Sequence, residues 1–325
     1  MALFNKISDP PISDPPMLWL YTEPLPLFGL SKAWFLWWCN AVAMTAHLGF
    51  AVVAIYVGSK GGGMQTPVLS LYLEEVSWTE RSSSSAQFDF EPSFRQLDGG
   101  LQLAWMTTGF FLLSALAHAI VVVFNWPSTS RAESDANWYY RWIQTCMNPL
   151  RWVEYAFSAS LMMLTIAYTS GIRGVYLLMC LTGLTFVTMT FGWLTEELSR
   201  PLAASDDVSP PVGWQIASPW MRLLPHFLGW IPYVLVWVIL LHTFYWNTRD
   251  ERDRMPSFVE PLVIAQFVIF TMFGVVQMVQ QCVSPRLYYW GEVAYCALSL
   301  TAKAYLGATL IVNTFMFTSF DEVNR

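Results

Sequence analysis

The sequence predicts an all-α membrane protein: seven transmembrane helices in one bundle, with a β-hairpin in the long first loop. Composition is the first indication, because 55% of the 325 residues are hydrophobic and only 12% are charged, against roughly 25% charged residues in soluble domains. Apolar segments of about 20 residues, the length that crosses a bilayer, are the second. The net charge of −6 provides no basic surface for nucleic acid, so the expected surroundings are a lipid bilayer.

Seven segments are long and apolar enough to cross the membrane. They run approximately over Ala33–Gly58, Leu101–Phe124, Leu150–Tyr168, Val175–Leu194, Leu223–Trp246, Val259–Val279 and Gly291–Phe317. The third segment is the shortest and carries Arg151 and Glu154 near its start. The fifth contains Pro232, which a membrane helix tolerates better than a soluble helix does.

The remaining sequence divides into two tails and one long loop. Residues 1–32 hold a tandem Ile-Ser-Asp-Pro-Pro repeat, whose proline density is typical of an extended tail. Residues 33–317 form the bundle, and residues 318–325 form a short C-terminal tail. Within the bundle, loop 59–100 contains a run rich in Val, Leu, Tyr and Trp at 68–78 and then a serine-rich turn. This pattern predicts a β-hairpin that caps one face of the bundle.

The charge distribution, the cysteines and the N-terminus give no further indication of function. Lys and Arg divide almost evenly between the two sides of the predicted bundle, so the positive-inside rule gives no orientation. The five cysteines have no metal-site spacing, and packing in the spans is their favoured role. The N-terminus lacks a basic segment followed directly by a short apolar core, so we expect no cleaved signal peptide.

Lys303 is the most informative residue, because it lies inside the seventh apolar segment. A charged lysine at the centre of a bilayer costs roughly 2.5–3.5 kcal/mol and usually marks a functional site. A buried amine is also suited to Schiff-base formation with an aldehyde or ketone. Ser299 lies one turn before Lys303 and can hydrogen-bond it, whereas Glu292 lies about three turns away on the same face. Glu292 is therefore either a gate or a solvated carboxylate at a helix N-terminus.

Glu154 is the carboxylate best placed to neutralise Lys303. A buried cation needs a counter-ion, and intramembrane carboxylates can serve as one. The alternative is an Arg151–Glu154 pair at positions i and i+3 near the membrane surface; the presence of Lys303 favours the counter-ion. Ser158, one turn after Glu154, could hydrogen-bond the carboxylate or line the pocket.

His47 and His118 lie in the middle of the first two segments. A lone membrane histidine is more often an interhelical hydrogen-bond partner than a reactive group. Two at matching depth favour a shared polar pocket that could accept a proton, and their sequence context does not support a metal site. Glu196 and Glu197 close the fourth segment.

The combination of seven spans, Lys303 and Glu154 resembles retinal-binding rhodopsins. The seventh segment lacks the Asn-Pro-x-x-Tyr motif of animal opsins, and Ser299 stands where microbial pumps usually have Asp. Arg151-Trp-Val-Glu-Tyr-Ala-Phe-Ser in the third segment and Ser299-Leu-Thr-Ala-Lys303 in the seventh resemble the corresponding motifs of the heliorhodopsin family. The two histidines and the long first loop also fit this family, and the resemblance covers about residues 33–317.

The resemblance implies all-trans retinal bound to Lys303 as a Schiff base. Glu154 would be its counter-ion, Ser299 a hydrogen-bond partner, and His47 and His118 a polar pocket. Tyr155 and Ser158 would also belong to the retinal site. The resemblance further implies a homodimer with a cytoplasmic N-terminus.

Three functions are compatible with these residues, and none of them is enzymatic. The first is a photosensor, because Ser299 replaces the pump aspartate. The second is a light-gated proton channel or transporter, with a path that would use four residues of the third, fourth and seventh segments: Arg151, Glu196, Glu197 and Glu292. The third is a membrane protein that does not respond to light.

Overall fold

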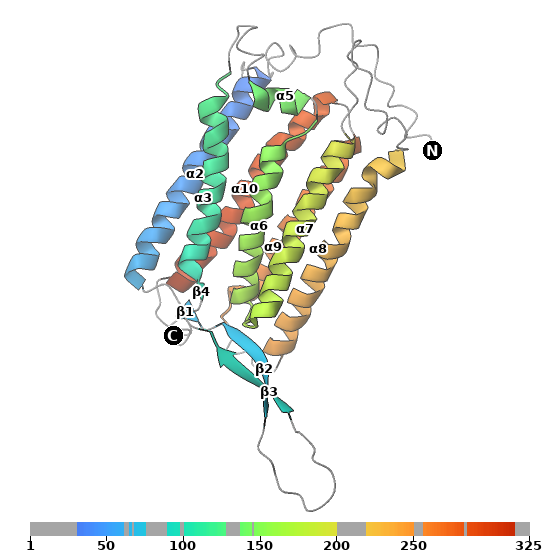
Figure 1. The fold of residues 1–325 in the computed structure, drawn as a ribbon. Helices are drawn as coiled ribbons and strands as arrows, with labels where there is room; N and C mark the ends of the chain where they lie inside the picture. Colours follow the sequence, from blue (N-terminus) through green and yellow to red (C-terminus); the bar gives the residue numbers. More distant parts are fainter. Residues whose placement is uncertain are drawn as a thin grey trace, which may run out of the picture.

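The structure is a computed structural model, and it describes residues 31–61, 65–66, 68–75, 90–97, 101–127, 137–144, 146–199, 219–249, 256–282 and 285–315. In this part of the chain, seven long helices pack side by side in one bundle (Figure 1). The predicted fold class is confirmed. The predicted C-terminal tail and nearly all of the predicted N-terminal tail lie outside the described residues.

The long helices follow the predicted segments closely. They are α2 (Lys32–Gly61), α3 (Leu103–Phe124), α6 (Pro149–Thr169), α7 (Val175–Ser199), α8 (Pro219–Thr248), α9 (Val259–Cys282) and α10 (Pro285–Leu310). A π-helical turn, Ile311–Phe315, continues α10. A short helix, α5 (Trp138–Gln144), crosses one end of the bundle between α3 and α6 (Figure 1).

Helix α6 differs from the other long helices in composition. Among the described residues, six helices are long and apolar enough to cross a membrane, and α6 falls outside this set. It stands in the middle of the bundle (Figure 1), and most of its residues are buried, Arg151 and Glu154 among them. A helix surrounded by other helices can carry polar side chains that lipid would not accept. The polarity of α6 therefore indicates an interior position.

The predicted hairpin is present at the end of the bundle opposite α5 (Figure 1). Strands β2 (Leu69–Glu75) and β3 (Phe90–Gln96) pair antiparallel, and β1 (Gln65–Thr66) pairs with β4 (Leu101–Gln102). The amide of Leu69 donates to the carbonyl of Arg173 over 2.9 Å. This bond ties the hairpin to the loop between α6 and α7.

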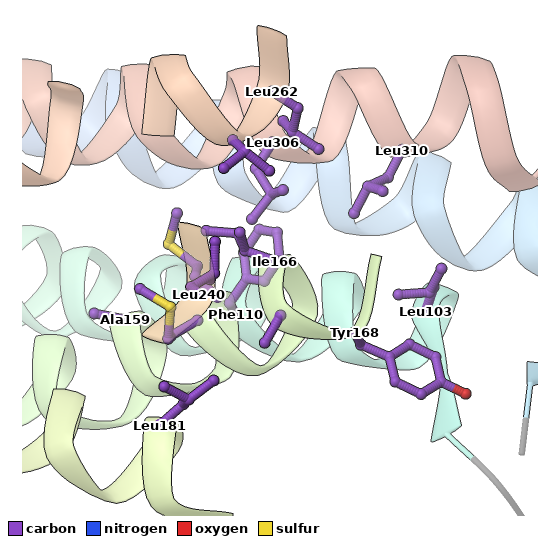
Figure 2. Close-up of a cluster of buried hydrophobic side chains, with 14 of the residues drawn as sticks. Leu103, Phe110, Ala159, Ile166, Tyr168, Leu181, Leu240, Leu262, Leu306 and Leu310 are labelled. Carbon is purple, nitrogen blue, oxygen red and sulfur yellow. The ribbon is translucent and has the colours of Figure 1, made fainter. Parts of the chain in front are cut away.

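The larger of two hydrophobic clusters fills the half of the bundle nearer the hairpin, and a smaller one lies at the end near α5. Figure 2 shows Phe110 of α3, Ile166 of α6 and Leu306 of α10 pointing into one space, with Leu240 of α8 beside them. Large apolar side chains also cover the outside of the helices, as Val52 of α2 does, because the bilayer replaces water there. The buried charged side chains Arg151, Glu154, Glu196 and Glu292 lie in the other half.

Candidate functional site

Helices α6 and α10 bring Lys303 and Glu154 together. Lys303 Nζ lies 3.2 Å from Glu154 Oε1 and donates to Ser299 Oγ over 2.8 Å. Lys303 is 2% exposed and Glu154 8% exposed. Because Coulomb attraction is strong and water is scarce at such a site, the two charges stabilise each other. The structure thus places all three residues as the sequence predicted, although their roles remain predictions.

A serine of α3 completes this group. Ser114 Oγ donates to Glu154 Oε1 over 2.5 Å. The carboxylate therefore accepts a hydrogen bond from α3 and forms an ion pair with α10. The Tyr155 ring lies beneath Lys303, with its centroid 5.2 Å from Nζ. Ser158, in contrast, has a buried hydroxyl without a hydrogen-bond partner in the described part of the chain. It lies in α6 near the site but does not bond Glu154.

The two predicted histidines face each other between α2 and α3. Their rings stack with centroids 5.6 Å apart, and His118 Nδ1 lies 2.8 Å from Asn40 Oδ1. Both ring nitrogens of His47 are buried and have no partner among the described residues. Such a site suits an ordered water. His118 and Glu154 also line one pocket, with about 400 Å³ of empty space.

Arg151 pairs with two carboxylates other than Glu154. Its Nη1 donates to Glu292 Oε1 and its Nη2 to Glu196 Oε1, which joins α6 to α7 and α10. Glu292 is 2% exposed, so the alternative of a solvated carboxylate is wrong, and so is the surface pair of Arg151 with Glu154. Glu197 lies apart, where it accepts a 3.4 Å bond from Trp193 of its own helix.

Neutral donors complete this group, which we call the arginine cluster: Arg151, Glu196, Glu292, Asn148, Gln280 and Tyr288. Asn148 bonds both carboxylates, through its side chain to Glu292 over 2.7 Å and its backbone amide to Glu196 over 3.0 Å. Tyr288 donates to Glu196 over 3.1 Å and Gln280 to Glu292 over 3.2 Å. One guanidinium and these neutral donors together stabilise two buried carboxylates.

A mostly apolar pocket opens beside Lys303. Its lining comes from α6 to α10 and consists mostly of apolar and aromatic side chains, as is usual for a small-molecule site. Gly192 and Gly274 shape its walls, because a Cβ on either would collide with the indole of Trp152 or Trp230. The indoles therefore lie directly against helix backbone. The chemistry of this lining, apolar and aromatic walls with the amine of Lys303 among them, suits a slender apolar ligand attached to that amine.

A chain of hydrogen bonds borders the same pocket on α8 and α9. Trp230 Nε1 donates to His226 Nε2 over 3.0 Å, so the proton of a neutral His226 lies on Nδ1, which is 3.1 Å from Gln277 Oε1. Gln277 in turn donates to the carbonyl of Gly192 over 2.7 Å. This chain joins α8, α9 and α7 along the pocket wall.

Sequence reasoning missed several polar partners. They are Asn40, Ser114, Asn148, His226 and Gln277. Two of them carried a usable signal: Ser114 is one turn from His118, and Asn40 is two turns from His47, so each pair shares a helix face. The others depend on which helices meet, and a single sequence does not show that.

Comparisons with known proteins agree with this architecture. A sequence profile of the family described as Heliorhodopsin matches residues 36–315. No curated protein matches the sequence.

Three solved structures are similar to the chain in fold. A light-driven proton pump LR (Mac) from Leptosphaeria maculans is 12% identical, with 85% of this chain and 94% of that chain covered and a TM-score of 0.54. A cyanorhodopsin from the cyanobacterium Tolypothrix sp. NIES-4075 is 10% identical, with 90% and 98% covered and a TM-score of 0.56. A thermophilic rhodopsin from Rubrobacter xylanophilus is 10% identical, with 85% and 95% covered and a TM-score of 0.55. These likenesses show the shared fold alone.

Replacing Arg151 by methionine tests the arginine cluster. Arg151→Met leaves Glu196 and Glu292 buried without a cation, so we expect a loss of about 3–5 kcal/mol in the free energy of unfolding. Thermal unfolding in detergent measures it. A triple variant that also carries Glu196→Gln and Glu292→Gln should recover most of the loss. An Arg151→Met protein as stable as the parent would contradict the role of Arg151 as the cation that stabilises Glu196 and Glu292.

Proposed function

The chain belongs to the heliorhodopsin family, and on that premise we propose that it is a light sensor carrying all-trans retinal on Lys303. The observation that carries the proposal is the position of Lys303, which lines the apolar pocket and has Glu154 3.2 Å from Nζ. Retinal, when bound, would supply absorption of visible light and isomerisation of its polyene. The protein would supply binding, orientation and electrostatics.

Glu154 is the group that would keep the nitrogen of Lys303 protonated. A negative charge at hydrogen-bonding distance favours the positive form of a buried nitrogen, and the pair is neutral overall. Ser114 holds the carboxylate, and Ser299 accepts from the nitrogen. Both hydroxyls limit the positions that the two charges can take, so the dark state has one defined hydrogen-bonding arrangement.

Illumination would turn the N–H at Lys303 away from Glu154. The nitrogen then holds its proton less tightly, because the stabilising charge no longer faces it. His118 shares a pocket with Glu154, and His47 stacks against it. We assign this histidine pair the role of proton acceptor, because it lies beside Glu154 and both ring nitrogens of His47 have no hydrogen-bond partner among the described residues.

A sensory role is favoured over ion pumping. Ser299 replaces a second carboxylate one turn before Lys303, and in the described part of the chain only Glu154 forms an ion pair with Lys303. The other buried carboxylates nearby, Glu196 and Glu292, are held by Arg151. A slow conformational change, in a homodimer with its N-terminus in the cytoplasm, would then be the output of the sensor.

A light-gated proton channel or transporter is the second candidate. The pocket that holds His118 and Glu154 is also lined by Arg151 and Glu292. It therefore runs from the Lys303 site to the arginine cluster. Protons could pass this way if light opened the contact between Arg151 and Glu292.

The visible absorption spectrum with added all-trans retinal tests pigment formation. The parent protein should develop a visible band. Lys303→Ala should develop none, because it lacks the only amine that lines the apolar pocket among the described residues. Glu197→Gln serves as a control for expression and folding, and should develop the parent band. A visible band in Lys303→Ala, or none in the parent, would contradict the proposal.

Photocurrent in voltage-clamped cells separates the two candidates. A sensor should give no steady current under light. A channel should give a current that Glu292→Gln reduces at least severalfold, since this change removes a carboxylate from the pocket lining. An undiminished current in Glu292→Gln would exclude the path through the arginine cluster, while any steady proton current in the parent would count against a purely sensory role.

A further inference from the structure

Helix α9 carries three buried glutamines, although most of its residues are apolar: Gln266, Gln277 and Gln280. Each side-chain amide donates to a backbone carbonyl elsewhere in the chain, and the acceptors are Ala302, Gly192 and Tyr288. Gln277 lies three turns after Gln266, about 20° around the helix, so the two share a face. Because a buried amide is costly unless it is hydrogen-bonded, these bonds fix how α9 sits against its neighbours.

Gln266 contacts the backbone of α10 directly before the proposed retinal lysine. Its Nε2 donates to the carbonyl of Ala302 over 2.9 Å, and Ala302 precedes Lys303. Gln266 is 0% exposed, and it is absent from the lining of the apolar pocket. The side chain can therefore act on Lys303 only through the backbone of α10.

The side-chain amide of Gln266 has one hydrogen-bond acceptor without a partner. Its Oε1 is buried and has no hydrogen-bond partner in the described part of the chain. A buried unsatisfied acceptor destabilises the folded state, whereas an apolar side chain would avoid that cost. The useful part of the side chain is therefore its Nε2 donor, which bonds the carbonyl of Ala302.

The other end of the same helix contacts the arginine cluster. Gln280 donates to Glu292 over 3.2 Å, and Gln277 joins the chain that runs through His226 to Trp230 on the pocket wall. Helix α9 is thus hydrogen-bonded at Ala302 beside Lys303, along the pocket and at the cluster. A packed helix moves largely as one body, and networks of this kind can carry coupling between sites.

We propose that Gln266 is a positioning residue for Lys303, and that it links movement of α10 at this lysine to α9 and through α9 to the arginine cluster. The proposal rests on the proposed function, because it concerns the movements that light absorption sets off. In the dark, the bond from Gln266 fixes the backbone at Ala302. When the lysine nitrogen turns, the strain on α10 reaches α9 through this bond and alters the contact between Gln280 and Glu292.

The test compares retinal-loaded, full-length variants in detergent. Gln266→Leu removes the bond at similar volume, and Gln266→Glu keeps a side chain that can donate when protonated. Gln281→Leu is the matched control on the same helix, since the Nε2 of Gln281 has no partner among the described residues. Flash photolysis gives the rate of dark recovery, and light-minus-dark infrared spectra give the carboxylate signal of the cluster, assigned with Glu292→Gln.

For Gln266→Leu we expect an absorption maximum close to that of the parent, dark recovery changed at least about fivefold, and a cluster signal reduced by half or more. Gln266→Glu should fall between Gln266→Leu and the parent. A folded Gln266→Leu protein that forms no pigment, where Gln281→Leu forms it, would equally support a positioning role.

Recovery within twofold of the parent together with an unchanged cluster signal would overturn the proposal, even if the melting temperature falls, because Gln266 would then only hold two helices together. Failure of the parent to form pigment would instead overturn the proposed function. The two failures are therefore distinguishable.

Discussion

The buried ion pair of Lys303 and Glu154 is the interaction on which the rest of the site depends. An unpaired lysine inside a bilayer is costly, and removing one partner of a buried pair typically costs about 3–5 kcal/mol. The pair therefore requires α6 and α10 to stay in contact. Ser114 and Ser299 add hydrogen bonds to each side of it, so α3 is held to the same point. These contacts fix the position of Lys303, which is a charged group that lines the apolar pocket.

A second ionic centre stands apart from the first. Arg151 lies three residues before Glu154 in α6, yet it turns to Glu196 and Glu292 on α7 and α10. Helix α6 thus carries one partner of each centre, which accounts for its interior position and its polarity. The pocket lined by both Glu154 and Glu292 lies between the centres. Charge at one centre can influence the other across this space, because both centres are buried and buried charges are screened less than exposed ones.

Much of the architecture could be predicted from the sequence, because bilayer-length apolar runs leave few alternatives. Lys303 and Ser299 could be paired because they are one turn apart on one helix, and Glu154 because a buried cation demands an anion. The partners of Arg151 could not be predicted, since they depend on how α6, α7 and α10 meet. Gln266 gave no signal of its own: a glutamine in an apolar helix has many uses, and only packing reveals which.

The most direct test of the central claim is a pH titration of the visible band in Glu154→Gln. If Glu154 stabilises the positive charge at Lys303, its removal should lower the pH at which the visible band is lost on alkalinisation by about 1–3 units. Glu197→Gln, which changes a carboxylate outside the site, should leave that midpoint unchanged. A Glu154→Gln midpoint equal to that of the parent would contradict the account, because another group would then have to balance Lys303.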